Sequence, residues 1–167
     1  MERRWDLVYN GEKMKKYAFI DRDGTMIIEP QHTFQIDSLD VLEVLPGVID
    51  CLKELKNDGF ALVMVSNQNG IGTPSFPQEN FDIPQKAFEE ILRKEGIEFD
   101  QVLVCPHFAE VGCECRKPKI GLVKDFDDID KENSIMIGDR DTDLEFADNL
   151  GIRGIKIELN KGMESVA

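Results

Sequence analysis

The chain has 167 residues, with 20 Lys and Arg against 33 Asp and Glu, so its formal net charge is −13. This acidity argues against a protein that binds a phosphate backbone, which needs a basic face. Hydrophobic residues make up 41% of the chain, enough for a packed core. No apolar run approaches the ~18 residues of a membrane span, and the start lacks the apolar stretch of a signal peptide. We therefore expect one cytoplasmic folded domain that acts on neither nucleic acid nor membrane.

The predicted elements alternate between strand and helix from residue 17 onward. Residues 1–15 show no periodicity, and we interpret them as a leader or an expression remnant before a domain of residues 16–167. Continuous apolar runs indicate buried strands at 17–20, 61–65, 102–104, 134–137 and 155–157. Helical patterns cover 46–58, 82–95, 122–126 and 142–149, with Asp82 as the expected cap of the second. This order predicts an α/β fold, a doubly wound parallel sheet covered on both faces.

Polar residues follow the predicted strands where such sheets bind ligands, at the carboxyl ends. Asp21 and Asp23 follow the first strand, on a loop that contains Gly24. Two carboxylates at this spacing can share one metal ion and one phosphoryl group, one as nucleophile and the other as acid or base. The alternative is a simple turn between a strand and a loop.

Three further groups accompany this pair. Ser66 and Asn67 end the second strand, where a hydroxyl and backbone N–H groups can hold phosphate oxygens. Arg116 and Lys117 belong to a dense basic run in an otherwise acidic chain, and Asp139 ends the fourth strand. Taken singly, each has an alternative interpretation: a turn cap, a solvated charge run, or an acidic helix N-terminus.

Together these groups resemble the motifs of the haloacid dehalogenase superfamily of phosphatases, over roughly residues 17–157. The matching positions, in the family's order, are Asp21, Asp23 and Thr25, then Ser66, then Lys117, then Asp139 and Asp143. The resemblance implies that Asp21 is a nucleophile that becomes a phosphoaspartate and that Asp23 is the general acid and base. It also implies that Asp21, Asp23 and Asp139 hold Mg²⁺, with Ser66 and Lys117 on the phosphate oxygens. We expect Thr25, Asn67 and Arg116 to contact substrate, and Asp143 either to bind a metal-bound water or to hold Lys117.

A second constellation holds three thiols and one imidazole within eleven residues: Cys105, His107, Cys113 and Cys115. A Cys₃His set suits Zn²⁺ and leaves no open coordination position, so the predicted zinc is structural. Free thiols are the alternative. The zinc would hold the loop that delivers Arg116.

This loop, ending in Cys-x-Cys-Arg-Lys-Pro, resembles a branch of the superfamily that contains histidinol-phosphate and heptose-bisphosphate phosphatases. The segment 70–82, the short interval between His107 and Cys113, and the Gly-Asp-Arg at 138–140 favour the first. The resemblance implies a small phosphomonoester substrate, histidinol phosphate, in histidine biosynthesis, with the heptose bisphosphate as alternative. In many bacteria this domain is fused to a dehydratase, so we expect either a single-function enzyme or a domain whose dehydratase half is missing.

Neither 25–46 nor 67–82 has room for a large cap domain. Glu29 and Gln35 are candidates for contacts to the imidazole and amine of histidinol; solvated loop residues are the alternative.

Three rival interpretations of the whole chain are weaker. A phosphoacceptor receiver domain carries its acceptor after the third strand, whereas Asp21 follows the first. A catalytically silent zinc-held interaction module would not need every chemical position filled. A polynucleotide 3′-phosphatase would need a basic surface, which does not suit the acidic charge of this chain.

Overall fold

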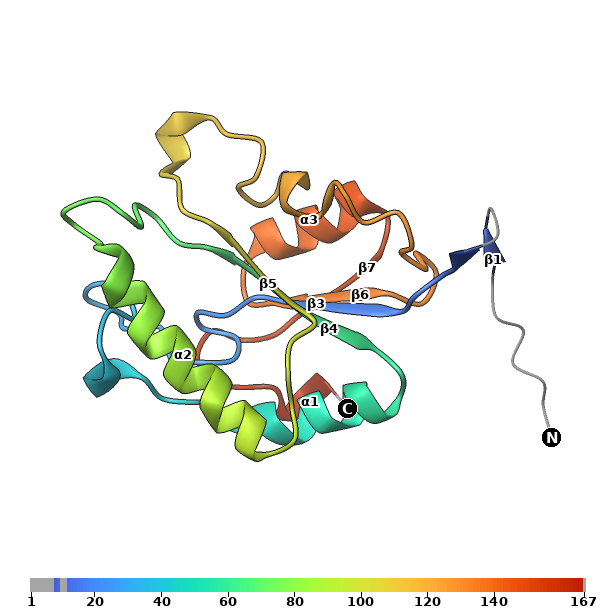
Figure 1. Ribbon diagram of the computed structural model, residues 1–167, viewed down its shortest axis with the longest axis horizontal. Helices are drawn as coiled ribbons and strands as arrows, with labels where there is room; N and C mark the ends of the chain where they lie inside the picture. Colours follow the sequence, from blue (N-terminus) through green and yellow to red (C-terminus); the bar gives the residue numbers. More distant parts are fainter. Residues whose placement is uncertain (1–7, 10–11, 167) are drawn as a thin grey trace.

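A computed structural model describes residues 8–9 and 12–166 of the chain. Its centre is a parallel sheet of five strands in the order β5-β4-β3-β6-β7 (Figure 1). The strands are β3 (Tyr17–Ile20), β4 (Ala61–Asn67), β5 (Gln101–Cys105), β6 (Ile135–Gly138) and β7 (Arg153–Lys156). A separate antiparallel pair, β1 (Val8–Tyr9) and β2 (Glu12–Lys13), precedes them. The other residues before 12 lie outside the described part, so the leader remains a prediction.

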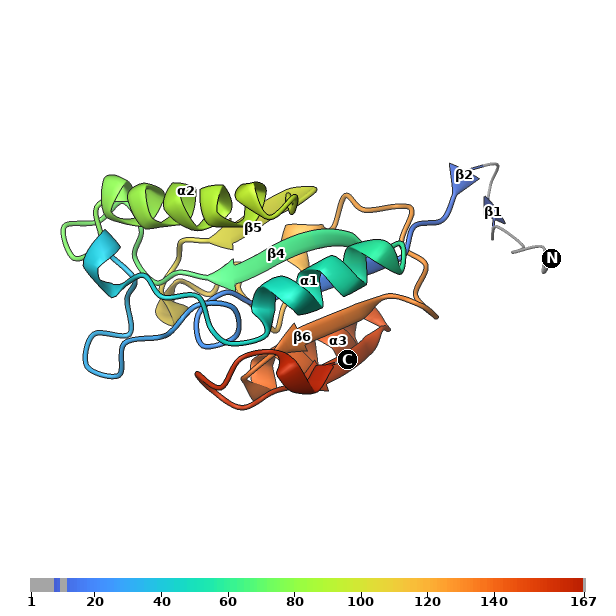
Figure 2. The same cartoon turned by 90° about the horizontal axis from the view of Figure 1, so that it is seen from below.

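Helices cover both faces of the sheet, which confirms the doubly wound arrangement. Helices α1 (Val48–Asn57) and α2 (Gln78–Lys94) lie on one face, and α3 (Asp141–Leu150) lies on the other (Figures 1 and 2). Short 3₁₀ helices occupy three connections: η1 (Leu39–Val41), η2 (Ala109–Val111) and η3 (Gly121–Val123). A fourth, η4 (Glu164–Val166), follows β7. Residues 25–46 hold only the short η1, and residues 67–82 only the end of β4 and the start of α2, so neither segment contains a large cap domain, as expected.

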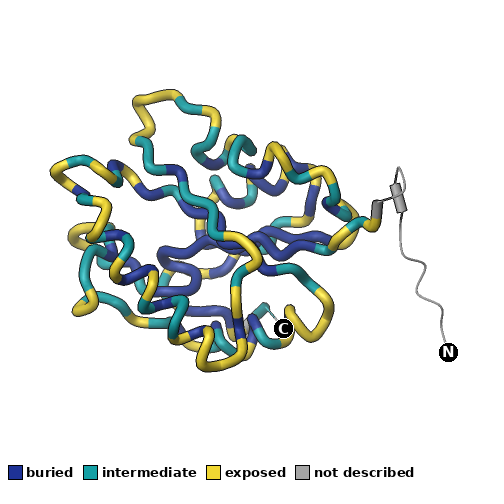
Figure 3. The backbone as a smooth tube through the Cα atoms, in the orientation of Figure 1, coloured by how far each residue is buried: buried dark blue, intermediate teal, exposed yellow. Residues whose placement is uncertain are grey.

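The strands are apolar on both sides because each side meets a different core. Ala18 and Ile20 pack with the residues of α1 and α2, whereas Tyr17 and Phe19 pack with those of α3. All four residues of β3 are buried, and Figure 3 shows the buried backbone concentrated in the central strands. Continuous apolar runs, rather than alternating ones, follow from this double covering.

The start of α2 differs from the prediction. The helix begins at Gln78 after Pro77, and Asp82 lies inside it, where it accepts a hydrogen bond from the Gln78 side chain. The first buried residue of α2 is Phe81, so the residues from Gln78 to Asn80 form a first turn without buried residues, which the apolar pattern does not mark. The predicted helix near 122–126 is only the single turn η3.

The register of the sheet brings the predicted motifs together. Ile20 pairs with Met64 on one side and with Ile137 on the other, so β3, β4 and β6 end at the same edge. The chain leaves β3 and β6 toward opposite faces, which makes their shared end the switch point where ligands bind. Within the described residues, no helix is both long enough and apolar enough to cross a membrane.

Candidate active site

Three carboxylates meet at the ends of β3 and β6. One carboxylate oxygen from each of Asp21, Asp139 and Asp143 lies within 4.8 Å of the others. The Thr25 hydroxyl donates to Asp139 Oδ1 at 2.9 Å and so orients it. Burial raises the pKa of Asp21, and burial together with the charge of Asp21 raises the pKa of Asp139 to about 7. Acids crowded in this way are suited to a divalent cation, which would relieve their repulsion.

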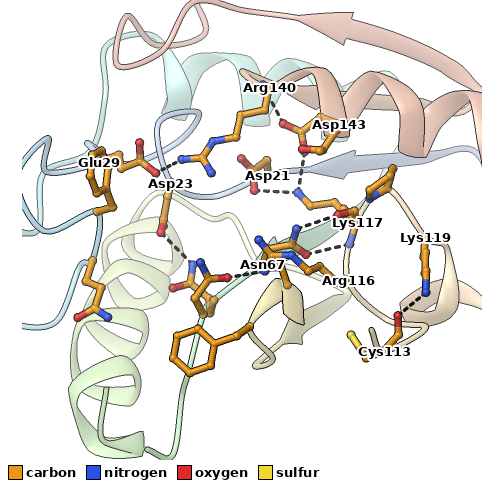
Figure 4. A pocket seen from close by; sticks show the side chains of 18 of the residues that line it. Asp21, Asp23, Glu29, Asn67, Cys113, Arg116, Lys117, Lys119, Arg140 and Asp143 are labelled. Atoms are coloured by element: carbon orange, nitrogen blue, oxygen red, sulfur yellow. Dashed lines mark hydrogen bonds and ion pairs between the residues drawn. The ribbon is translucent and has the colours of Figure 1, made fainter. Parts of the chain in front are cut away.

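Lys117 is the cation that the structure places among these acids. Its Nζ donates to Asp21 Oδ1 at 2.9 Å and to Asp143 Oδ1 at 2.7 Å (Figure 4). It also donates to the Val65 carbonyl at 2.7 Å. Burial alone would lower the pKa of Lys117, but Asp21 and Asp143 raise it, so the side chain stays protonated. The Asn67 amide fixes the Lys117 backbone by accepting from its N–H at 2.9 Å and donating to its carbonyl at 3.1 Å.

Asp143 holds Lys117 and also caps the first turn of α3. Its Oδ1 faces Lys117, and its Oδ2 accepts from the Arg140 backbone N–H at 3.1 Å. A Cβ at Gly138 would lie 2.1 Å from Asp143 Oδ2, so only glycine leaves room for this carboxylate. Of the two roles expected for Asp143, the geometry favours the lysine contact.

Asp23 lies on the pocket wall between two donors that sequence reasoning missed. Arg22 Nε donates to Asp23 Oδ1 at 2.6 Å, and Gln68 Nε2 donates to Asp23 Oδ2 at 3.0 Å. Gln68 also donates to Ser66 Oγ at 2.8 Å. The only sequence signals were the position of Gln68 beside Ser66 and the position of Arg22 inside the Asp-x-Asp motif.

Most predicted site residues line one pocket at this edge of the sheet: Asp21, Asp23, Glu29, Gln35, Asn67, Arg116 and Lys117. Ser66, Thr25 and Asp139 do not line it. Ser66 is buried and its hydroxyl accepts from Gln68, and the Thr25 hydroxyl donates to Asp139. The substrate contact expected for Thr25 stays a prediction. Arg140, which the sequence analysis used in the Gly-Asp-Arg match but did not name as a site residue, does line it.

Glu29 is not the solvated loop residue of the alternative interpretation. It is 4% exposed, and its carboxylate accepts a hydrogen bond from the Arg140 guanidinium. Asn160 holds the Glu29 backbone at both its N–H and its carbonyl. Burial raises the pKa of Glu29, although Arg140 opposes this. The pocket wall therefore carries a fixed salt bridge between Glu29 and Arg140 rather than a free carboxylate.

The four residues of the predicted zinc site converge in the loop after β5. Cys115 Sγ lies 3.1 Å from Cys105 Sγ and 3.6 Å from Cys113 Sγ, and His107 Nδ1 lies 3.2 Å from Cys115 Sγ. A tetrahedron with Zn–S bonds of ~2.3 Å has edges of about 3.8 Å, so the donor set has nearly the size of a zinc site. The loop also reaches the pocket, because Cys113 and Arg116 line it. Arg116 Nη1 donates to the His107 carbonyl at 3.1 Å.

Comparison with known proteins agrees with this geometry. A family model described as "Polynucleotide kinase 3 phosphatase" matches residues 16–155. The histidine biosynthesis bifunctional protein HisB of Actinobacillus pleuropneumoniae serotype 3 is 54% identical over 146 residues, which are 86% of this chain and 40% of the relative. HisB of Legionella pneumophila strain Lens is 48% identical over 157 residues, which are 92% of this chain and 44% of the relative.

A solved structure also superposes closely. It is the D,D-heptose 1,7-bisphosphate phosphatase from B. bronchiseptica, complexed with magnesium and phosphate. It has a TM-score of 0.78 and 25% identity, over 90% of this chain and 85% of that one. The chain spans about two fifths of the length of the curated relatives. On its fold, motifs and matches, the chain belongs to the polynucleotide kinase 3 phosphatase family and is a phosphatase of the haloacid dehalogenase superfamily.

Proposed function

We propose that this domain is a Mg²⁺-dependent phosphomonoesterase that hydrolyses L-histidinol phosphate to L-histidinol and phosphate, in the cytoplasm. The observation that carries the proposal is a pocket lined by Asp21, Asp23 and Lys117, with Asp139 beside Asp21, in a segment about half identical to histidine biosynthesis proteins. The remainder of those relatives, beyond the two fifths that this chain matches, would correspond to the dehydratase half.

The residues that would hold Mg²⁺ are Asp21 and Asp139, together with the backbone carbonyl of Asp23. Carboxylate and carbonyl oxygens are the ligands that this ion prefers. When bound, the ion would neutralise charge on the phosphoryl group. Lys117 adds a second positive charge beside Asp21, at 2.9 Å from Oδ1.

The chemistry then follows from the two carboxylates of the first motif. The Asp21 carboxylate attacks phosphorus and forms a phosphoaspartate, while Asp23 gives its proton to the leaving alcohol oxygen. Asp23 next takes a proton from water, which attacks phosphorus and releases Asp21. Arg116, which lines the pocket, is placed to bind the phosphate oxygens.

The alcohol part of the substrate would lie against the outer wall of the pocket, near Glu29 and Gln35. Two exposed aromatic residues line the same pocket, Phe34 (58% exposed) and Phe108 (41% exposed). Phe34 has a φ of 57°, a conformation that is unfavourable for a bulky residue. Exposed aromatic faces suit a flat, protonatable ring such as imidazole.

We propose that Cys105, His107, Cys113 and Cys115 hold a structural zinc ion. The support is the size of the donor set and its four protein ligands, which leave no position for substrate. The ion would hold the segment from which Arg116 and Lys117 extend.

Two alternatives remain as outcomes of the test. The solved relative at 25% identity is a heptose bisphosphate phosphatase, so that sugar phosphate is the second candidate. The family description raises a 3′-phosphorylated polynucleotide as another, which a net charge of −13 disfavours. A catalytically silent zinc-held module would release no phosphate from any of them.

The test is phosphate release with Mg²⁺ from histidinol phosphate, heptose bisphosphate and a 3′-phosphorylated oligonucleotide. We expect the highest kcat/KM for histidinol phosphate, and no turnover or phosphoenzyme for Asp21→Asn, because an amide is a poor nucleophile. A higher kcat/KM for heptose bisphosphate would reject the substrate, and near-normal activity of Asp21→Asn would reject the mechanism.

A further inference from the structure

Arg22 is an unusual residue in the catalytic loop because its charged side chain is fully buried. It is 0% exposed, although it stands between Asp21 and Asp23 at the edge of the sheet. Its Nε donates to Asp23 Oδ1 at 2.6 Å, and its Nη1 donates to Gln85 Oε1 at 3.0 Å. The guanidinium carbon lies 4.8 Å from the centroid of the Phe81 ring on α2.

Burial of this charge is costly, and the site does not satisfy it completely. Moving an ion out of water costs several kcal/mol, which only good partners recover. Nη2 is the one buried side-chain nitrogen or oxygen in the described part of the chain without a hydrogen-bond partner. An apolar side chain would fill this space at lower cost. The contact with Asp23 is therefore the feature that distinguishes Arg22 from a packing residue.

Gln68 holds the other oxygen of the same carboxylate. Its Nε2 lies 3.0 Å from Asp23 Oδ2, and the side chain is 3% exposed. The Gln68 backbone N–H donates to the Cys105 carbonyl at 2.8 Å, so this residue is anchored to the end of β5. Arg22, in contrast, is anchored to α2 through Gln85.

We propose that Arg22 and Gln68 are positioning residues that hold the Asp23 carboxylate in the orientation needed for proton transfer. Each carboxylate oxygen accepts from one donor, and the two donors are anchored to different elements, so the carboxylate is held at both oxygens. This inference rests on the proposed role of Asp23. In the first step the Asp23 proton goes to the leaving oxygen as the ester P–O bond breaks and the Asp21 P–O bond forms. The two donors then stabilise the resulting carboxylate until it takes a proton from water.

Leaving groups separate this role from a purely structural one. An alkyl phosphate needs Asp23 as an acid, whereas 4-nitrophenyl phosphate has a stable leaving anion and does not. Because kcat/KM reports the phosphorylation step, we expect Arg22→Met and Gln68→Leu to lower it by ~10²-fold for alkyl phosphates, including histidinol phosphate. For 4-nitrophenyl phosphate, kcat/KM should change by less than about threefold. A burst of 4-nitrophenolate should precede a slower steady state, since the second step still needs Asp23 as a base.

The controls are Asp23→Asn and Phe88→Leu. Asp23→Asn should show the same dependence on the leaving group. Phe88 is fully buried in α2, and no hydrogen bond joins it to the site, so Phe88→Leu should lower stability without altering that dependence. Arg22→Lys, which keeps the charge but loses the Nε donor, should fall between wild type and Arg22→Met. If Arg22→Met does not fold, Gln68→Leu tests the Asp23 carboxylate through its other oxygen, Oδ2.

Two results would overturn the inference, and they are distinguishable. If Asp23→Asn lowers both classes of ester equally, Asp23 is not the acid, and the proposed mechanism fails along with the inference. If Asp23→Asn behaves as expected but Arg22→Met and Gln68→Leu lower both classes equally, the mechanism stands and the positioning role is wrong.

Discussion

The buried pair of Lys117 and Asp143 offers the sharpest test of how the site is built. Both side chains are almost completely buried, at 2% and 1% exposed, with 2.7 Å between Nζ and Oδ1. Asp143→Ala leaves the lysine charge with one carboxylate, Asp21, and one carbonyl. Breaking a buried pair from one side costs about 3–5 kcal/mol, because the other charge remains desolvated. At about 2–4 °C per kcal/mol for a chain of this size, Tm should fall by about 6–20 °C.

The measurement is thermal and urea unfolding of the protein without added metal. Asp141→Ala is the matched control, since Asp141 lies in the same first turn of α3 but its side chain is 80% exposed and paired with the exposed Lys156. We expect its Tm to stay close to that of wild type. Asp143→Asn, which keeps an oxygen acceptor, should lose less than Asp143→Ala. If Asp143→Ala is as stable as Asp141→Ala, or if Asp143→Asn loses only Mg²⁺ affinity, Asp143 does not act through Lys117.

Three further outcomes are expected. In protein purified under reducing conditions, Cys113→Ser should abolish the zinc content found by elemental analysis. It should also lower Tm, because metal binding is coupled to folding of the loop. Wild-type protein without zinc would contradict the site. Gly138→Ala should lower the free energy of unfolding by about 1–3 kcal/mol in urea, since its Cβ would meet the Asp143 carboxylate at 2.1 Å; an unchanged stability would show that the carboxylate lies elsewhere. Glu29→Gln weakens the pair with Arg140 and should raise KM for histidinol phosphate about fivefold, which corresponds to about 1 kcal/mol of binding free energy. KM for a small ring-free ester should change less. Equal changes would count against a contact between Glu29 and the alcohol part of the substrate.

The order of elements and the chemical motifs could be predicted from the sequence. Continuous apolar runs that end at Asp21, Ser66 and Asp139 indicate parallel strands, and the carboxyl ends of such strands meet at one edge. The cysteine loop could also be predicted, because its ligands lie within eleven residues and local chain geometry suffices to bring them together.

The partners of the charged side chains depended on the tertiary structure. Glu29 and Arg140 are separated by 111 positions, and Lys117 and Asp21 by 96, so no local pattern joins them. In the sequence, Arg22 resembles a solvent-exposed charge, yet the packing of α2 against the catalytic loop buries it beside Asp23. The physical reason is that apolar periodicity reports which residues leave water, whereas a charge is buried only where the folded chain supplies its partner from a distant segment.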